Sequence, residues 1–234
     1  MLRTGVLRYD HRRQRCNGGM NMQKIKQLIR EYRALLLFVF LLIFFRTAYA
    51  DWSPVPTSSM EPTILPGDVL WIDKTHYGPS LPFLNKRLLT WGHPERGDII
   101  TFIPPHEDIL YVKRVMAIAG DSIRIEGNDI YVNGVQLEQS LVESNDSELI
   151  GSEIIAGTEH AFKISKDRRL PYVGRTILVP ENKLFVMGDF RNNSADSRVW
   201  GFVDENNVLG KVSAVAVSFS SERQGLSRLA ISIQ

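Results

Sequence analysis

The stretch Ile123–Gly134, IRIEGNDIYVNG, sets the expectation for the fold class. Two short runs rich in β-branched and aromatic residues, Ile123–Ile125 and Ile130–Val132, are separated by Gly127-Asn128-Asp129, and the second run is followed by Asn133-Gly134. Asn, Asp and Gly tolerate the positive φ angles of tight hairpin turns. The stretch therefore predicts short antiparallel strands joined by tight turns.

The same pattern recurs on both sides of this hairpin. No long amphipathic helix separates the runs, and strands without alternating helices favour an antiparallel sheet or barrel over a doubly wound fold. We therefore expect a mostly β domain. Its clearest further strands are expected at Val69–Ile72, Ile99–Ile103, Tyr111–Ile118, Leu184–Met187 and Val212–Phe219.

The charge of the chain is unevenly distributed. The 234 residues carry a net charge of +2, but residues 1–33 hold nine basic residues against two acidic ones, so this segment has a balance of +7 and the remainder −5. A mildly acidic body argues against a nucleic-acid partner, because nucleic-acid binders carry their basic charge on the folded surface. The oligomeric state cannot be read from the sequence.

Metal and cofactor chemistry has no support in the sequence. The single cysteine, Cys16, lies in the basic segment, so the rest of the chain has no internal disulfide, no cysteine metal site and no thiol nucleophile. The five histidines are scattered, without the spacing of metal ligands. We therefore expect no metal and no cofactor.

An apolar run follows the basic segment. Ala34–Phe45 contains twelve consecutive apolar residues, and a span of the ~30 Å hydrocarbon core needs ~20 residues, so a membrane helix would have to extend from about Tyr32 to Trp52. The alternative is a cleaved secretory signal, because Ala48-Tyr49-Ala50 fits an A-x-A site. Both alternatives leave the basic end in the cytoplasm and the following domain across the membrane.

Three segments of the body carry chemically suggestive residues. Pro54–Ile64 has three prolines that hold the chain extended around Ser58 and Ser59, although alone it also fits a Ser/Thr/Pro linker. Tyr111–Val115 places Lys113 in an apolar strand, where a lysine is costly unless it is paired or neutral. Gly188–Gly201 is a dense polar block beside a strand.

These segments resemble one known family. They read S-M-x-P-T at Ser59–Thr63, R-G-D-I-I at Arg96–Ile100, a strand-borne Lys113-Arg114, and G-D-x-R-x-N-S-x-D-S-R-x-W-G at Gly188–Gly201. In this order after an apolar N-terminal segment, they resemble the bacterial type I signal peptidases (leader peptidases), over roughly residues 46–203. The resemblance implies a Ser-Lys serine protease on a mostly β fold that removes signal peptides on the outer face of the cytoplasmic membrane.

The resemblance also implies roles for individual residues. Ser59 would be the nucleophile and Lys113 the general base, with the Thr57 hydroxyl and the Ser59 amide forming the oxyanion hole. Ser194 would orient the lysine, and Asp196 and Arg198 would form an ion pair that braces the site. Small side chains at substrate positions −1 and −3 would be bound by shallow apolar pockets. The residues expected to line these pockets are Val55, Pro56, Met60, Ile64, Tyr111 and Val112.

The chemistry expected of Lys113 sets a condition on its surroundings. A serine hydroxyl is a weak nucleophile until an adjacent base takes its proton, and lysine is a base only when neutral. Its ordinary pKa of ~10.4 leaves roughly one lysine in 2,500 neutral at pH 7. We therefore expect burial to lower the pKa of Lys113 by ~2 to 3 units, with Asp196 facing Arg198 rather than the amine.

The resemblance divides the chain into segments. Residues 1–33 would be a basic cytoplasmic segment, 34–52 a single transmembrane helix, 53–121 and 183–219 the catalytic β domain, 122–182 a smaller β insertion, and 220–234 a tail. The expected partners are preprotein signal peptides and the lipid bilayer of the bacterial inner membrane, with the catalytic domain on the periplasmic face. Four acidic residues of the insertion are expected to form a solvated loop rather than a metal site: Glu143, Asp146, Glu148 and Glu153.

Departures from the family pattern are concentrated near the site. Ser58 stands where the family has Gly, Ala119 replaces the Pro of G-x-P-G-D, and Phe190 and Asn192 replace the Asn and Asp of G-D-N-R-D-N-S. No proposed catalytic group is lost, but the loss of one acid is expected to weaken the polar brace. The pattern indicates a divergent member with a narrower set of substrates.

Two other hypotheses remain open at this level. The same Ser-Lys chemistry would serve a specialised maturation protease of one secretion or conjugation system. It would also serve a self-cleaving relative of the repressor autoproteases. Such a relative would need a DNA-binding head, and here the apolar segment stands in its place. Alternatively, the chain would be a non-enzymatic exported β domain released by cleavage after Ala50. Ala48-Tyr49-Ala50 also fits the family's own cleavage rule, so cleavage of one copy by another is a further hypothesis.

Overall fold

The computed structural model describes residues 22–78, 80–81, 86–87, 89–169, 173–220 and 231–232. Cys16 and the remainder of residues 1–21 lie outside these ranges, as does most of the expected tail. The chain divides into two compact units, Met1–Leu42 and Ile43–Gln234.

Helix α1 (Met22–Tyr49) has 28 residues and covers most of the apolar run. Its residues 35–42 form an unbroken series of exposed apolar side chains. Across the part of the chain that the structure describes, no helix combines the length and the apolar character needed to cross a membrane.

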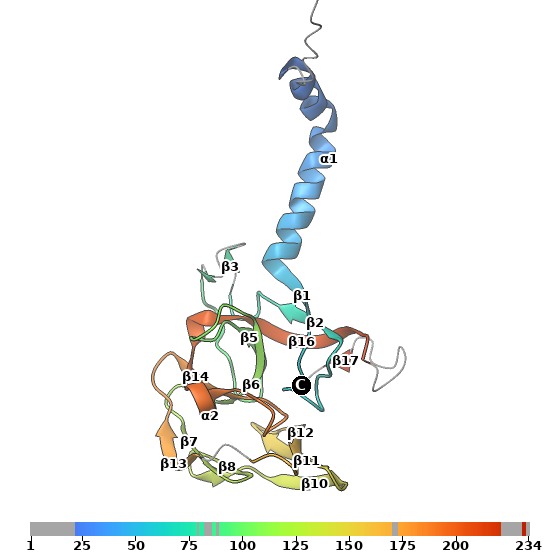
Figure 1. The fold of residues 1–234 in the computed structure, drawn as a ribbon. Coiled ribbons are helices and arrows are strands. Elements are labelled where there is room, and N and C mark those ends of the chain that lie inside the picture. Colours follow the sequence, from blue (N-terminus) through green and yellow to red (C-terminus); the bar gives the residue numbers. More distant parts are fainter. Residues whose placement is uncertain are drawn as a thin grey trace, which may run out of the picture. The chain divides into compact units, whose positions relative to one another are not determined.

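The second unit is built around an antiparallel sheet of eight strands. Its order is β1-β2-β16-β5-β6-β14-β15, and β17 pairs with β16 (Figure 1). The expectation of a mostly β, antiparallel domain is confirmed. The strands are β1 (Ala50–Pro54), β2 (Asp68–Asp73), β5 (Ile99–Phe102), β6 (Tyr111–Ala117), β14 (Lys183–Met187), β15 (Val203–Asp204), β16 (Val208–Ser218) and β17 (Ile231–Ser232).

Three smaller sheets complete the described strands. The first contains β10 (Gln139–Ser144), β11 (Glu148–Ile155) and β12 (Thr158–Ser165). The second contains β13 (Val173–Leu178), β7 (Ser122–Glu126), β8 (Asp129–Val132) and β9 (Val135–Gln136), and the third contains β3 (Ser80–Leu81) and β4 (Lys86–Arg87). Figure 1 shows β7, β8, β10, β11 and β12 gathered at one end of the β unit.

The turns expected from glycine and asparagine are present. Gly127, between β7 and β8, has a φ of 63°, and Asn133 and Gly134, between β8 and β9, have φ angles of 53° and 79°. These angles lie in the left-handed region that suits Gly and Asn. Two short helices, α2 (Ser197–Trp200) and the 3₁₀ helix η1 (Glu205–Asn207), follow β14.

Strand β6 is the strand that positions the site. It lies between β5 and β14 and is buried from Lys113 to Ala117. Its apolar side chains enter different core clusters: Met116 and Ala117 pack with Ile123 and Phe185, whereas Val115 packs with Ile100 and Val186. A strand packed on both faces is held rigidly, so it presents Lys113 in a fixed place.

Candidate active site

Ser59 lies at the start of a turn that follows the extended segment after β1. The turn is closed by main-chain hydrogen bonds from the Glu61 amide to the Ser58 carbonyl (3.0 Å) and from the Ile64 amide to the Met60 carbonyl (2.9 Å). Met60 and Ile64 are buried in the core, with exposed fractions of 1% and 0%. These two apolar side chains anchor the turn and leave Ser59 half-buried beside them.

Lys113 meets Ser59 across 54 residues of sequence. The amine nitrogen of Lys113 lies 2.6 Å from the hydroxyl oxygen of Ser59, within hydrogen-bond distance. The lysine residue is only 4% exposed, and its amine lies 5.5 Å from the centre of the Tyr111 ring. The structure therefore brings the two residues of the expected dyad into direct contact.

Burial dominates the electrostatics of Lys113. It lowers the pKa of the amine from 10.5 to about 8, while the charges of Asp196 and Asp189 oppose this effect and the charge of Arg198 reinforces it. A dry environment disfavours the ammonium form, which explains the direction of the shift.

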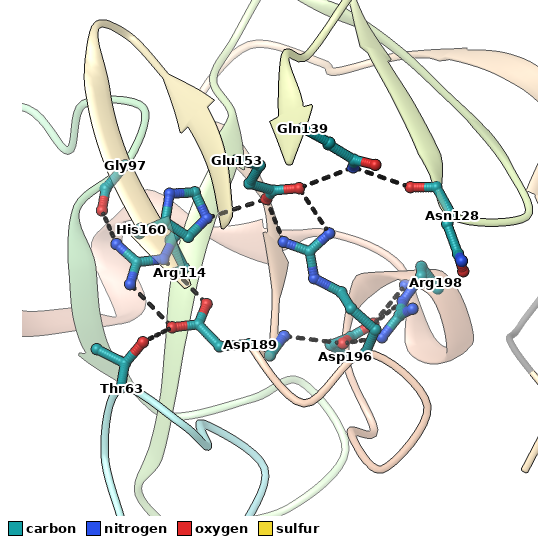
Figure 2. A network of polar contacts seen from close by, with 12 residues as sticks. Thr63, Gly97, Arg114, Asn128, Gln139, Glu153, His160, Asp189, Asp196 and Arg198 are labelled. Atoms are coloured by element: carbon teal, nitrogen blue, oxygen red, sulfur yellow. Dashed lines mark hydrogen bonds and ion pairs between the residues drawn. The ribbon is translucent and has the colours of Figure 1, made fainter. Parts of the chain in front are cut away.

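Two buried ion pairs neutralise the acidic groups near the lysine. Asp196 binds Arg198 through both carboxylate oxygens, at 2.8 and 2.7 Å, and also accepts the Gly188 amide at 3.0 Å. Asp189 binds Arg114 at 2.9 and 2.8 Å, with side chains 1% and 0% exposed. Figure 2 shows both pairs in one polar network.

Ser194 lies in the block that faces the dyad, and it is 8% exposed. Its hydroxyl has no hydrogen-bond partner among the described residues, so the expected bond to the Lys113 amine is not present in this arrangement. Gly188 explains the close packing here. A Cβ atom at Gly188 would lie 2.3 Å from the Ser194 hydroxyl oxygen and 2.4 Å from the Ser59 carbonyl oxygen.

A cleft of about 590 Å³ runs past the dyad. Its walls include Ser59, Lys113 and the exposed Thr57. Five of the six residues expected to bind substrate line it: Val55, Pro56, Met60, Tyr111 and Val112. The sixth, Ile64, is fully buried in the core behind the turn. The cleft also includes Asn193, from the Gly188–Gly201 block, and two residues that no motif indicated, Ile109 and Leu110.

The expectation for Glu153 is wrong. Instead of lying in a solvated loop, its side chain is 0% exposed. It binds Arg191 through both oxygens and His160 at 2.9 Å, and it accepts a hydrogen bond from Gln139 at 3.1 Å (Figure 2). Burial alone would raise the pKa of Glu153, but the charge of Arg191 and the hydrogen bonds from His160 and Arg191 hold it well below its usual range.

Asn192 makes three hydrogen bonds that the motif did not indicate. Its amide nitrogen donates to the carbonyls of Ser165 (2.6 Å) and Arg168 (2.7 Å), and its oxygen accepts the Ser165 amide at 2.9 Å. An ionised carboxylate has no proton to donate to a carbonyl. The Asp of the family pattern could therefore not make all three bonds, whereas the Asn192 amide does.

Lys163, on β12, ties the β10–β12 sheet to the turn that carries Ser59. Its amine lies 2.9 Å from the Glu61 carboxylate, 2.8 Å from the Glu148 carboxylate and 4.9 Å from the centre of the Phe190 ring. The Phe190 amide in turn donates to the Ser59 carbonyl at 3.1 Å. No motif indicated Lys163, because its partners lie far from it in sequence.

Potential metal ligands do not gather at this site. Across the described part of the chain, no three His, Cys, Asp or Glu side chains form a group that could hold a metal ion.

Comparison with known proteins places the chain in a family. The family model for signal peptidase, peptidase S26, matches residues 28–217. Signal peptidase I of Pseudomonas aeruginosa is 32% identical over 209 residues, covering 82% of this chain and 74% of the relative. A probable signal peptidase I-2 of Synechocystis is 30% identical over 187 residues, covering 76% and 68%.

Solved structures also match this chain. The crystal structure of a signal peptidase I from Enterococcus faecalis has a TM-score of 0.34 and 25% sequence identity, covering 52% of this chain and 97% of that one. The family match and the curated relatives exclude the non-enzymatic alternative. The chain belongs to the signal peptidase family of serine endopeptidases, peptidase S26.

Proposed function

We propose that this chain is a membrane-anchored serine endopeptidase that cleaves signal peptides from exported preproteins, with Ser59 as nucleophile and Lys113 as general base. The observation that carries the proposal is the 2.6 Å distance between the Lys113 amine and the Ser59 hydroxyl at the wall of the cleft. Both groups are within reach of a peptide bound there.

In the acylation step, neutral Lys113 accepts the proton of the Ser59 hydroxyl as its oxygen attacks the scissile carbonyl carbon. The Thr57 hydroxyl and the Ser59 amide bind the resulting oxyanion, and such donors each contribute ~3 to 4 kcal/mol in other proteases. The C–N bond then breaks, and the lysine returns the proton to the leaving amine of the mature protein.

In the deacylation step, Lys113 takes a proton from water, and the hydroxide attacks the acyl-enzyme ester. The ester bond breaks, Ser59 recovers its proton from the lysine, and the signal peptide leaves with a new carboxylate. No metal or cofactor enters either step.

The lowered pKa makes this cycle feasible near neutral pH. With a pKa of about 8, roughly one lysine in ten is neutral at pH 7, compared with roughly one in 2,500 at the ordinary pKa. In the proposed site, Ser194 aims the amine through a hydrogen bond that forms when substrate binds, because apo contacts of catalytic groups often tighten in the complex.

Substrate choice is proposed to follow from the cleft. Val55, Pro56, Met60, Tyr111 and Val112 give it apolar walls, which suit small side chains at positions −1 and −3 of an extended peptide. Ile64 would act from behind the wall, by supporting Met60 in the same core cluster.

Attachment to the membrane is proposed from the sequence and from α1. A basic segment (1–33) precedes the apolar segment (34–52), and residues 35–42 are exposed. Basic residues stay on the cytoplasmic side, which would put residues 53–121 and 183–219 on the outer face, with 122–182 as the insertion. A retained anchor would keep the enzyme beside substrates that are themselves held in the bilayer.

A preprotein-cleavage assay tests the dyad. The full-length protein in detergent is compared with Ser59→Ala, Lys113→Ala and the control Lys183→Ala, whose lysine forms a surface ion pair with Asp204 at 2.8 Å. We expect the first two variants to lose at least ~10³-fold in kcat, because nucleophile and base act as one unit. The control should keep full activity. Retention of activity by either dyad variant would contradict the assignment of Ser59 as nucleophile and Lys113 as base.

A further inference from the structure

Ser58 places a second hydroxyl next to the nucleophile. Its oxygen accepts a hydrogen bond of 2.8 Å from the amide nitrogen of Asn193. Ser58 and Asn193 both line the cleft, together with Ser59. The contact therefore lies on the surface over which a bound peptide must pass.

The direction of this hydrogen bond is determined by a third residue. The Arg168 guanidinium donates to the side-chain oxygen of Asn193. A guanidinium has donors only, so the amide oxygen must face Arg168 and the amide nitrogen must face Ser58. Ser58 is consequently an acceptor in this pair, and its own proton is free. Among the described residues, the structure gives that proton no acceptor.

The three residues sit on a well-held scaffold. The main-chain carbonyl of Arg168 accepts the Asn192 side chain at 2.7 Å, and the Asn193 amide donates to the Phe190 carbonyl at 3.0 Å. These bonds place Arg168 and Asn193 independently of their contact with Ser58. The Ser58 hydroxyl is thus presented to the cleft in a preorganised orientation.

A purely structural role for this contact is the simpler alternative. However, the turn that carries Ser59 is already tied down by three other bonds: the Phe190 amide to the Ser59 carbonyl, Lys163 to Glu61, and the Thr63 hydroxyl to Asp189. A hydrogen bond with a purely structural role would also hold the turn equally well if Ser58 donated and Asn193 accepted. A tie has no need of the unused proton that the Ser58 hydroxyl keeps at the cleft wall.

We propose that Ser58 is a further substrate-binding residue, whose hydroxyl donates a hydrogen bond to a main-chain carbonyl of the peptide in the cleft. Asn193 and Arg168 are its positioning residues. This inference rests on the proposed function, because it places the substrate beside Ser59. An extended peptide carries an acceptor at every residue, so the contact adds affinity without selecting a side chain.

Two single variants and their combination test the direction of the bond. Ser58→Ala removes the hydroxyl. Asn193→Asp keeps the size of the side chain and the contact with Arg168, but its carboxylate can only accept a hydrogen bond. The Ser58 hydroxyl then donates to this carboxylate and no longer donates to the substrate. We expect each variant to raise KM about five- to tenfold, the effect of one hydrogen bond, with kcat within about twofold. The double variant should match the singles.

The conditions and controls separate other causes. Assays at pH about 9.5 keep Lys113 mostly neutral in every variant, so the added charge of Asn193→Asp does not act through the base. Ser140→Ala removes a hydroxyl pair with Ser152 (2.8 Å) in the β10–β12 sheet, and Asn206→Asp adds a charge at an exposed site. Both controls should keep the wild-type KM.

Each outcome has a clear meaning. A KM within twofold of wild type in Ser58→Ala overturns the inference, as does a wild-type KM in Asn193→Asp beside a raised KM in Ser58→Ala. A fall in kcat or melting temperature with unchanged KM shows a structural tie and also overturns it. If Ser59→Ala or Lys113→Ala retain activity, the proposed function itself fails, whatever Ser58 does.

Discussion

Asp196 and Arg198 form a bidentate ion pair whose side chains are 0% and 1% exposed, and the two residues act on the pKa of Lys113 in opposite directions. Asp196 raises this pKa and Arg198 lowers it. Burial is the largest influence on the pKa of the amine, and Arg198 opposes part of the effect of Asp196. The ion pair thus allows an acid to lie near Lys113 without keeping the lysine protonated.

The first prediction concerns the pH dependence of the reaction. In the proposed mechanism only neutral Lys113 acts as the base, so kcat should rise with pH and level off above the pKa. With a pKa of about 8, the midpoint of the rise is expected near pH 8 in the enzyme–substrate complex, and kcat/KM should show it in the free enzyme. Profiles between pH 6 and pH 10 measure both. A midpoint near 6.5 would point to a histidine base instead.

The second prediction separates the partners of the ion pair. Asp196→Asn leaves the positive charge of Arg198 uncompensated and should move the midpoint to lower pH, whereas Arg198→Met leaves the carboxylate and should move it to higher pH. Both variants leave a buried charge unpaired, which should lower the free energy of unfolding by ~3 to 5 kcal/mol. The profile is therefore recorded on the folded fraction. Shifts of the same sign in both variants would contradict the electrostatic account.

Much of the fold is readable from local sequence. Runs of β-branched residues predicted β2, β5, β6, β7, β14 and β16, because a half-buried pleated surface favours such side chains. The Asn133-Gly134 turn was predictable because few other residues adopt its positive φ angles. Motif order indicated the segments that carry Ser59 and Lys113, although their contact spans 54 residues.

The rest of the site depends on long-range partners. Glu153 looked like one acid of an exposed loop, and nothing near it in sequence predicts its burial against Arg191, 38 residues away. The hydrogen bonds of Asn192 could not be predicted either, because its two acceptors are the main-chain carbonyls of Ser165 and Arg168, which lie far from it in sequence. Local patterns report which face of a strand is apolar, but they do not report which charges the fold will bring together.

The third prediction follows from the burial of Lys113. Its pKa is about 8 in the folded protein and returns to the ordinary 10.5 when the chain unfolds, so between these values the unfolded chain binds more protons than the native state. Stability should therefore rise with pH across this window, and the full cost of charging the lysine applies below pH 8. Lys113→Met should be more stable than wild type at pH 7 by on the order of 3 kcal/mol.

Denaturant unfolding at pH 7, 8.5 and 10.5 measures this difference. The advantage of Lys113→Met should shrink steadily with pH and vanish near 10.5. The exposed Lys26→Met provides the control, with no change expected beyond ~0.5 kcal/mol at any of the three pH values. A constant advantage for Lys113→Met would mean that packing, rather than charge, accounts for the gain.

The fourth prediction concerns Glu153. Glu153→Gln leaves the Arg191 guanidinium buried without a counter-charge, so it should lower the free energy of unfolding by ~3 to 5 kcal/mol at pH 7. The pKa of the carboxyl is depressed in the folded state, so its stabilising effect is present above pH 4.5 and is lost as the pH falls below that value. The gap between variant and wild type should narrow at pH 3.

The exposed pair of Arg124 and Glu126 supplies the matched control, since its side chains are 39% and 44% exposed. Glu126→Gln should change stability by less than ~1 kcal/mol, because solvent screens surface pairs. Urea unfolding of both variants at the two pH values distinguishes them. An equal, small loss in both would show that the Arg191 charge is compensated elsewhere.

The fifth prediction concerns the close approach at Gly188. A Cβ there would lie 2.4 Å from the Ser59 carbonyl oxygen and 2.3 Å from the Ser194 hydroxyl oxygen, so Gly188→Ala must change the position of both relative to residue 188. Displacement of catalytic groups by about 1 Å costs on the order of 10²-fold in rate. Gly210→Ala is the matched control, because its Cβ would lie 2.6 Å from the Asp73 carbonyl oxygen in the main sheet.

Both variants should lose stability, but only Gly188→Ala should lose kcat per folded molecule, because only Gly188 touches the turn that holds Ser59. Equal kcat values in the two variants, measured on the folded fraction, would show that the position of Ser59 does not depend on this contact.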